Sequence, residues 1–175
     1  MIKGRQKSRI ERYNTKIKTA KKLPVHIACI NFLFDENFGY LARAAGCFGV
    51  NTINIIGAMP NRRVAKKLSG SLVDYLDIKT WKNPSEFLEN VRQNKGKIIA
   101  AELCDNSSSF NDYSFDFSYQ NYIFVGHETY GVPAEIQHSS ELVYIPMPGI
   151  GYCLNTSQVA NIMLYEAAKQ YENIT

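Results

Sequence analysis

Residues 25–56, VHIACINFLFDENFGYLARAAGCFGVNTINII, decide the fold class of this chain of 175 residues. The apolar run at 25–31 is typical of a buried strand, and the run at 52–56 is typical of a second one. Between them, residues 39–48 carry apolar side chains at helical spacing. A strand, a helix and a second strand in this order predict an α/β domain with a mostly parallel sheet.

The rest of the chain continues this alternation. Further strands are expected at 75–81, 97–103, 121–126 and 142–147, and further helices at 83–94, 132–139 and 156–172. Asn83 as the N-cap and Pro84 as the first helical residue form a good helix start. The stretch 62–70 fits either a short helix or a loop, and 104–118 is polar with scattered aromatic residues, which is typical of a loop. We therefore expect about six strands, with helices on both faces of the sheet.

Composition and length favour one globular domain. Hydrophobic residues make up 45% of the chain, enough for a sizeable core. We place this domain at 25–175, after a basic N-terminal arm at 1–24. No stretch approaches the roughly 20 apolar residues that span a bilayer, and no apolar signal-peptide segment follows the charged start. We expect a cytoplasmic protein with no membrane partner.

The cysteines and histidines do not indicate a metal site or a disulfide framework. The four cysteines include no C-x-x-C pair, and the three histidines show no metal-ligand spacing. Cys29, Cys47 and Cys104 lie in or next to apolar runs. We expect them to be buried free thiols.

The positive charge of the chain is concentrated in its arm. Residues 1–22 hold nine Lys or Arg residues and one Glu, a net charge of +8, whereas the remainder holds 11 basic and 15 acidic residues, a net charge of −4. This asymmetry indicates a polyanionic partner, most simply nucleic acid, although a solvated, partly disordered tail would have the same composition. Ile10, Tyr13, Ile17 and Ala20 fall at helical spacing, so we expect part of the arm to be helical. The arm residues expected to bind RNA are Lys16, Lys18, Lys21 and Lys22.

Three stretches near strand ends carry unusual residues. In DENFGYLAR, residues 35–43, Asn37 and Gly39 are expected at a strand-to-helix turn, and Arg43 in the first or second turn of the helix. Taken alone, Arg43 fits a surface or salt-bridge role, because most arginines are exposed. In IFVGHETYGVP, residues 123–133, two glycines flank Glu128 and allow a tight turn.

The third stretch is YIPMPGIGYCLNTSQVAN, residues 144–161. Its prolines and glycines predict a stiff, sharply folded loop suited to clamping a small flat ligand. Asn155, Thr156 or Ser157 can cap the helix that follows. Neither G-x-G-x-x-G after the first strand nor G-x-x-x-x-G-K-[ST] is present, so the two common nucleotide-binding loops are excluded.

In this order, the three stretches resemble the motifs of the SpoU (TrmH) family of RNA ribose methyltransferases, in the SPOUT superfamily. The resemblance covers roughly residues 25–171. The family motif N-x-G-x-x-x-R is carried by Asn37, Gly39 and Arg43, and G-x-E-x-x-G by Gly126, Glu128 and Gly131. The third motif, I-P-M-x-G followed by S-L-N and a helix, is carried by Ile145, Pro146, Met147, Gly149, Leu154 and Asn155. Two positions depart from the usual family sequence: Cys153 replaces a serine, and His127 stands where Asn or Pro is common.

The resemblance implies a fold and a cofactor. The family fold has a C-terminal trefoil knot, which would run here from about Tyr122 into the last helix. The implied cofactor is S-adenosylmethionine. Its expected binding residues are Leu103, Gly126, Ile145, Met147, Gly149, Cys153, Leu154 and Asn155. Family members are usually homodimers, and Val159, Ile162 and Met163 are the expected interface residues.

The resemblance also implies an activity, methyl transfer to a ribose 2′-hydroxyl without a metal. Arg43 would be the central catalytic residue and would contact RNA, with Asn37, Glu128 and Asn155 as the other catalytic residues. Arg43 would act either as a transient base or as a group that holds a phosphate and stabilises the oxyanion. We expect tRNA as the substrate, with rRNA as an alternative. A non-catalytic RNA-binding relative and a base methyltransferase are the other hypotheses, whereas a nicotinamide dehydrogenase would need the missing glycine fingerprint.

Overall fold

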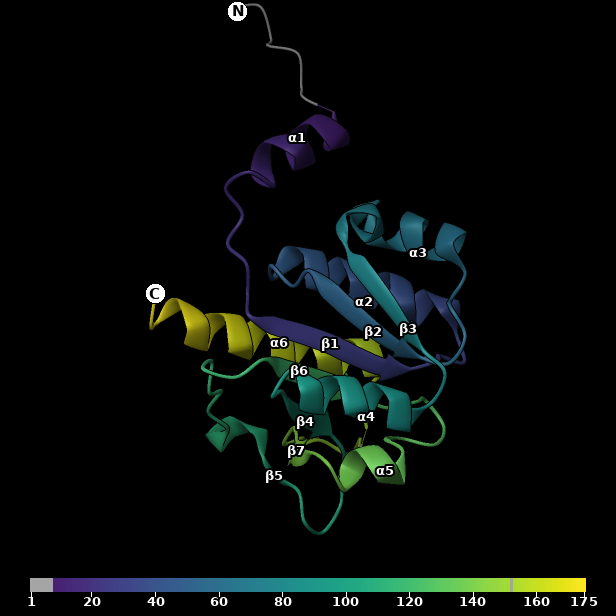
Figure 1. The fold of residues 1–175 in the computed structure, drawn as a ribbon, viewed down its shortest axis with the longest axis vertical. Helices are drawn as coiled ribbons and strands as arrows, with labels where there is room; N and C mark the ends of the chain where they lie inside the picture. The colour runs from purple at the N-terminus through teal and green to yellow at the C-terminus, as the bar shows by residue number, and fades with distance from the viewer. Residues whose placement is uncertain (1–7, 152) are drawn as a thin grey trace, which may run out of the picture.

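The computed structural model describes residues 8–151 and 153–175, which form an α/β structure around one seven-stranded sheet (Figure 1). The strand order is β3-β2-β1-β6-β4-β7-β5, and every pairing between these strands is parallel. The strands are β1 (Val25–Ile30), β2 (Thr52–Ile56), β3 (Asp77–Trp81), β4 (Lys97–Ala101), β5 (Ser108–Ser109), β6 (Asn121–Val125) and β7 (Glu141–Tyr144). The helices are α1 (Arg9–Lys16), α2 (Asp35–Cys47), α3 (Arg62–Ser69), α4 (Pro84–Gln93), α5 (Ala134–Gln137) and α6 (Thr156–Glu172), with short 3-10 helices η1 (Leu72–Tyr75) and η2 (Phe110–Asp112).

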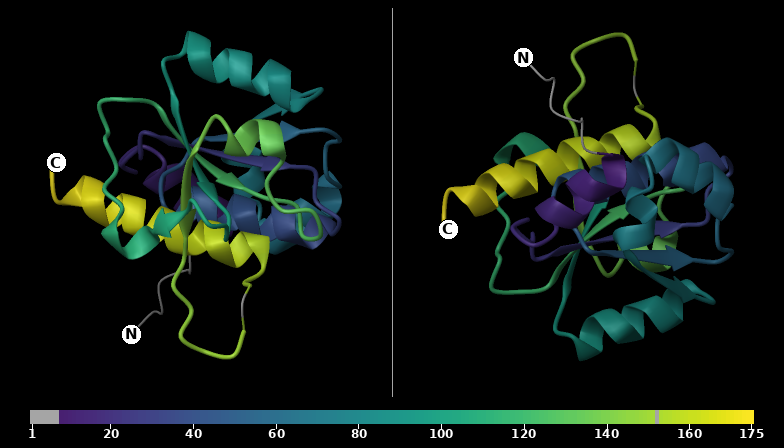
Figure 2. Two further views of the ribbon diagram at one scale, coloured as in Figure 1. Left: turned by 90° about the horizontal axis from the view of Figure 1, so that it is seen from below. Right: turned by 90° about the horizontal axis from the view of Figure 1, so that it is seen from above.

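The predicted fold class is confirmed. Helices cover both faces of the sheet, with α4 and α6 on opposite sides (Figure 2). One core contains Phe38 and Leu41 from α2 together with Leu164 from α6, all fully buried. The other contains Phe87 from α4 and Ile136 from α5. The trefoil knot stays a prediction.

The sheet has one strand more than expected. The extra strand, β5, lies within 104–118, a stretch for which we predicted a loop, and its two residues pair with Val143 and Tyr144 of β7. A strand of two residues is too short to show alternation in the sequence. Strands β4 and β7 also end two and three residues earlier than predicted, at Ala101 and Tyr144. The residues after both ends therefore belong to loops at the carboxyl edge of the sheet.

Helix α2 begins four residues earlier than predicted, which changes the position of three motif residues. Asn37 and Gly39 lie inside the helix rather than in a turn before it, and Arg43 lies in its third turn. Asn and Gly are poor helix formers, and this hid the true start. A Cβ atom on Gly39 would lie 2.7 Å from Cβ of Leu68 in α3. Gly39 therefore permits the close packing of α2 against α3.

The described part of the arm contains the helix α1, but its apolar stripe does not form one packed face. Ser8 caps α1 in a capping box with Glu11. The ring of Tyr13 packs edge-on against Tyr75, whereas Ile10 and Ile17 stay exposed. The helix ends at Lys16, so Ile17 lies beyond its last turn and Ala20 lies farther along the arm. The basic residues Lys3, Arg5 and Lys7 lie outside the described residues.

Two sets of burial predictions need correction. Of the cysteines expected to be buried, only Cys29 is, while Cys104 is half-buried and Cys47 is exposed. Cys47 lies in the last turn of α2, on the side that faces away from the sheet core. Met163, expected at a dimer interface, is fully buried in this chain's own core. It points from α6 toward the sheet, so it cannot contact a second subunit.

Candidate active site

A cavity of about 250 Å³ lies at the carboxyl ends of β4, β6 and β7. Ligands bind at this edge of open α/β sheets because the loops after neighbouring strands meet there. Six of the eight predicted cofactor residues line the cavity: Leu103, Gly126, Ile145, Met147, Cys153 and Leu154. The other lining residues are Ala101, Glu102, Val125, His127, Glu128, Gly131, Val143, Tyr144, Thr156 and Val159.

The other two predicted cofactor residues lie elsewhere. Gly149 is exposed in the loop before α6, and a Cβ atom placed on it would have no neighbour within 4 Å. Asn155 lines a groove on the far side of its own turn.

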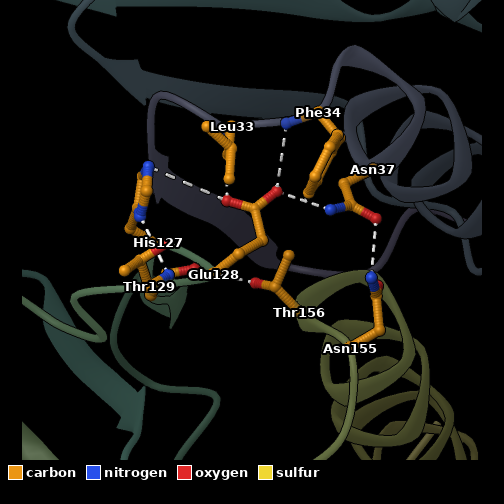
Figure 3. Close-up of polar contacts among 9 residues, drawn as sticks. Leu33, Phe34, Asn37, His127, Glu128, Thr129, Asn155 and Thr156 are labelled. Atoms are coloured by element: carbon orange, nitrogen blue, oxygen red, sulfur yellow. Dashed lines mark hydrogen bonds and ion pairs between the residues drawn. The ribbon is translucent and has the colours of Figure 1, made fainter.

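Glu128 ties the second motif to the first. Its carboxylate accepts hydrogen bonds from the backbone N–H groups of Leu33, at 2.9 Å, and Phe34, at 3.4 Å, and from the side-chain amide of Asn37 (Figure 3). Burial of the Glu128 carboxyl acts to raise its pKa, but these hydrogen bonds, first from Leu33 and then from Asn37, favour the charged form and lower the pKa. Glu128 is therefore an ionised anchor at neutral pH.

Asn155 extends this chain to the third motif. Its Nδ2 donates to Oδ1 of Asn37 at 2.9 Å, and its Oδ1 accepts from the backbone N–H and the hydroxyl of Ser157, at 2.9 and 2.7 Å. Asn155 is therefore the N-cap of α6, one of the three candidates that the sequence offered. Three residues far apart in sequence form one hydrogen-bonded chain from Glu128 through Asn37 to Asn155, which we call the amide relay.

The glycines around Glu128 allow the turn that presents it. His127 and Gly131 exchange two backbone hydrogen bonds of 2.9 and 3.0 Å, which close the turn. Gly131 has a φ of 66°, and a Cβ atom on it would lie 2.5 Å from Oε2 of Glu102. On Gly126, a Cβ atom would lie 2.5 Å from the carbonyl carbon of Gly131. Both positions therefore require glycine, which gives G-x-E-x-x-G a structural reason.

Arg43 lies outside the amide relay. It is exposed and, within the described residues, forms no hydrogen bond or ion pair. It lines a second hollow, a groove of about 680 Å³ between α2 and the start of α6, together with Asn37 and Asn155. The remaining groove residues are Tyr40, Ala44, Cys47, Phe48, Ser157, Gln158 and Asn161.

The cavity and the groove share a wall. Along the turn into α6, Leu154 and Thr156 line the cavity, whereas Asn155 and Ser157 line the groove. Thr156 fixes this wall to the sheet edge, because its hydroxyl donates to the carbonyl of Gly126 at 2.9 Å. The cavity and the groove therefore adjoin along the turn of residues 154–157.

The chain matches the model of the SpoU rRNA Methylase family over residues 24–165. It belongs to this family. The tRNA (guanosine(18)-2′-O)-methyltransferase of Escherichia coli strain K12 is 24% identical over 156 residues, which cover 88% of this chain and 67% of that enzyme. Among solved structures, the Aquifex aeolicus TrmH/SpoU tRNA modifying enzyme has a TM-score of 0.80 at 23% identity and covers 93% of this chain and 86% of that one. An AdoMet-bound rRNA methyltransferase from Sinorhizobium meliloti has a TM-score of 0.77 at 22% identity, covering 85% of this chain and 57% of that one.

The two departures from the SpoU family sequence have different surroundings. Cys153 is exposed at the cavity, and its thiol has no hydrogen-bond partner in the described part of the chain. His127 supports the turn around Glu128: its Nδ1 accepts the N–H of Thr129 at 3.0 Å, and its ring stacks on Tyr130 with centroids 5.0 Å apart. Its Nε2 lies 3.9 Å from Oε2 of Glu128.

Sequence reasoning missed Glu102 and the role of Thr156 in this SpoU-family site. The Glu102 carboxylate accepts the N–H groups of Val132, at 2.8 Å, and Leu103, at 3.2 Å, and so connects the ends of β4 and of the Glu128 turn. The sequence feature that could have indicated Glu102 is a carboxylate directly after an apolar strand. Among residues 8–151 and 153–175, no group of His, Cys, Asp and Glu side chains could hold a metal ion, and no helix is long and apolar enough to cross a membrane.

Proposed function

We propose that this SpoU-family chain transfers a methyl group from S-adenosylmethionine to the 2′-hydroxyl of a ribose in RNA. The observation that carries the proposal is that the cavity and the groove adjoin at one turn. Methyl transfer needs a donor and an acceptor in contact and in line. A cavity for the donor and a groove with Arg43 for the acceptor meet at the turn of residues 154–157.

The cavity suits S-adenosylmethionine. Leu103, Ile145, Met147 and Leu154 offer apolar surface for a flat purine, and the open ends of β4, β6 and β7 offer backbone polar groups beside it. When bound, the cofactor supplies an electrophilic methyl group on a sulfonium that leaves as a neutral thioether. The AdoMet-bound rRNA methyltransferase from Sinorhizobium meliloti has the same fold, which supports this assignment.

The surroundings of Arg43 favour a role as an anion clamp over a role as a base. A guanidinium is a very weak proton donor to water, and acting as a base would require it to lose its charge first. Arg43 is exposed in the groove and has no carboxylate partner in the described residues. Its five N–H donors are thus available to an RNA phosphate and to the developing oxyanion. Asn37 and Asn155 shape the wall against which the ribose would be positioned.

The substrate we propose is tRNA, because the Escherichia coli relative is named a tRNA (guanosine(18)-2′-O)-methyltransferase. The Sinorhizobium meliloti relative, named an rRNA methyltransferase, keeps rRNA as the alternative. We also propose a homodimer. Its support is apolar surface on α6, where Ile162 and Tyr165 are 37% and 59% exposed.

The test is methyl transfer from labelled S-adenosylmethionine to bulk tRNA and rRNA, followed by digestion to nucleosides. We expect label on the ribose of one nucleoside. Label on a base would show a base methyltransferase, and cofactor titration without detectable binding would favour a non-catalytic RNA-binding protein. Arg43→Ala should bind the cofactor but lose at least about 10²-fold in transfer rate, whereas the control Arg92→Ala, on α4, should not.

A further inference from the structure

Helix α3 carries an unusual share of the positive charge. Outside residues 1–22 the chain has 11 basic residues, and four of them lie in this one helix. They are Arg62, Arg63, Lys66 and Lys67, and all four are exposed. The helix contains no acidic residue. Its charge therefore stands out on a chain that is otherwise acidic beyond the arm.

Only part of this charge is neutralised. Asp74 accepts from Lys66, at 2.6 Å, and from Arg62, at 3.3 Å. The hydrogen bond from Lys66 is the main reason that the pKa of Asp74 is lowered. Arg63 and Lys67 form no ion pair within the described residues. Asp74 thus neutralises only one of the four positive charges of α3, and the helix keeps a net positive charge.

The position of α3 connects the candidate active site to the arm. At its start, the N–H of Asn61 donates to Oδ1 of Asp35 at 2.9 Å, which ties it to the first residue of α2. At its end it turns through Gly70 into η1, where Tyr75 packs against Tyr13 of α1 with ring centroids 5.7 Å apart. The hydroxyl of Tyr75 also donates to Asn14 of α1 at 3.2 Å. In Figure 1, α1 lies above α3.

The arm extends the same charge. Arg12 and Lys16 of α1 and Lys18, Lys21 and Lys22 after it are all exposed. Because Tyr75 holds α1 beside η1, the basic residues of the arm and those of α3 lie on neighbouring elements. A polyanion that lies across α3 and α1 would meet exposed basic side chains of both elements.

We propose that α3 and the docked helix α1 form one cationic face that binds the phosphate backbone of RNA away from the methylated nucleotide. The face extends the proposed function, on which the choice of RNA as the polyanion rests. Side chains such as Arg63 and Lys67 would contact phosphates, which are the same for every nucleotide. They would therefore add affinity and orientation but no base specificity. Binding through them releases counterions and must weaken as salt rises.

The test is the salt dependence of RNA binding. The double variant Arg63→Gln/Lys67→Gln removes two charges and leaves the pairs with Asp74 intact. The matched control Lys82→Gln/Lys95→Gln removes two exposed charges at the ends of α4, on the other face of the sheet. Binding to deproteinised bulk tRNA is measured without cofactor over a series of KCl concentrations. Equal thermal midpoints for all three proteins establish that the fold is kept.

We expect the α3 variant to reduce the slope of log K against log [KCl] by roughly 1.4–1.8, which corresponds to two phosphate contacts. At 0.1 M salt its affinity should fall by roughly tenfold per contact. The control should keep the wild-type slope.

Equal slopes for the α3 variant and the control would overturn the inference, as would a wild-type protein that binds anionic lipid vesicles but no tRNA. The proposed function is judged separately, by methyl transfer. Wild-type protein that binds tRNA through α3 but transfers no methyl group would refute that function alone, and transfer combined with unchanged slopes would refute this face alone.

Discussion

Replacing Asn37 with alanine cuts the amide relay in its middle. Asn37 is 5% exposed, and both ends of its side-chain amide are used: Nδ2 donates to Glu128, and Oδ1 accepts from Asn155. The substitution leaves the mostly buried Glu128 carboxylate with its two backbone donors and without its side-chain donor. It also removes the acceptor for Nδ2 of Asn155, while the N-cap bond of Asn155 to Ser157 remains.

The expected cost follows from these two losses. A hydrogen bond to a charged group contributes about 1.5–3 kcal/mol, and a neutral one about 0.5–1.5 kcal/mol. Alanine is the better helix former and offsets roughly 0.5 kcal/mol of this loss. We therefore expect Asn37→Ala to lower the free energy of unfolding by about 1.5–4 kcal/mol. Because the relay also holds the wall between cavity and groove, a shift of about 1 Å there would cost about 10²-fold in methyl transfer.

Urea unfolding measures the first effect, and a radiolabel transfer assay measures the second. The matched control is Asn90→Ala in α4, which replaces another helical asparagine whose side chain has no hydrogen bond in the described part of the chain. It should stay within about 0.5 kcal/mol of the wild type. A loss for Asn37→Ala that is no larger than that of Asn90→Ala would refute the reasoning, since the relay would then add nothing to stability.

Three further predictions follow from the structure. The folded-state pKa of Glu128 is lowered below 4.5, so the ionised carboxylate contributes its full stability above that pH, and this stability is lost as the pH falls through the lowered pKa. In urea unfolding at a series of pH values, Glu128→Gln should lack this part of the acid dependence. A Glu128→Gln profile equal to that of the wild type would contradict the prediction. Alkylation of the cysteines followed by mass spectrometry tests the two hollows. S-adenosylhomocysteine should protect Cys153, which lines the cavity, and RNA should protect Cys47, which lines the groove. Protection of both cysteines by S-adenosylhomocysteine alone would show that the cavity and the groove are not separate sites. Tyr75→Ala should release α1, so that trypsin cleaves the arm faster while the thermal midpoint of the protein stays unchanged. An unchanged cleavage rate would mean that Tyr75 does not hold α1 in place.

The sequence was sufficient for the architecture because the central strands are mostly apolar runs. Strands β1, β2 and β6 each contain several fully buried residues, and their short length and high content of β-branched and aromatic residues identify them as strands. The errors fall where local propensity and tertiary packing disagree. Gly39 is unfavourable in a helix, yet α2 includes it because α3 packs against it too closely for a side chain. Strand β5 exists only because β7 lies beside it.

The candidate site was predictable in its residue types but not in its contacts. Hydrogen bonds of the relay join residues 91 and 118 positions apart, and no local pattern encodes such distances. The motifs indicated that Asn37, Glu128 and Asn155 belong together. They did not indicate that Arg43 shares the groove with Asn37 and Asn155 without a hydrogen bond to either, because its position depends on where α2 begins. Glu102 was missed for the same reason: its partners, the N–H groups of Leu103 and Val132, come together only at the folded sheet edge.

The relay has a direction, and the direction explains why one carboxylate is followed by two amides. An ionised carboxylate can only accept, so Glu128 forces Asn37 to turn its NH₂ group toward it. The Asn37 oxygen then points the other way and can accept only from a donor, which Nδ2 of Asn155 supplies. This leaves the Asn155 oxygen to face the N-terminus of α6, where it accepts from Ser157. An aspartate at position 37 or 155 would place two acceptors against each other, so the chain of donors requires an amide at both positions. Each amide orientation is thereby fixed from the carboxylate outward, and the wall between cavity and groove has a single hydrogen-bonded arrangement.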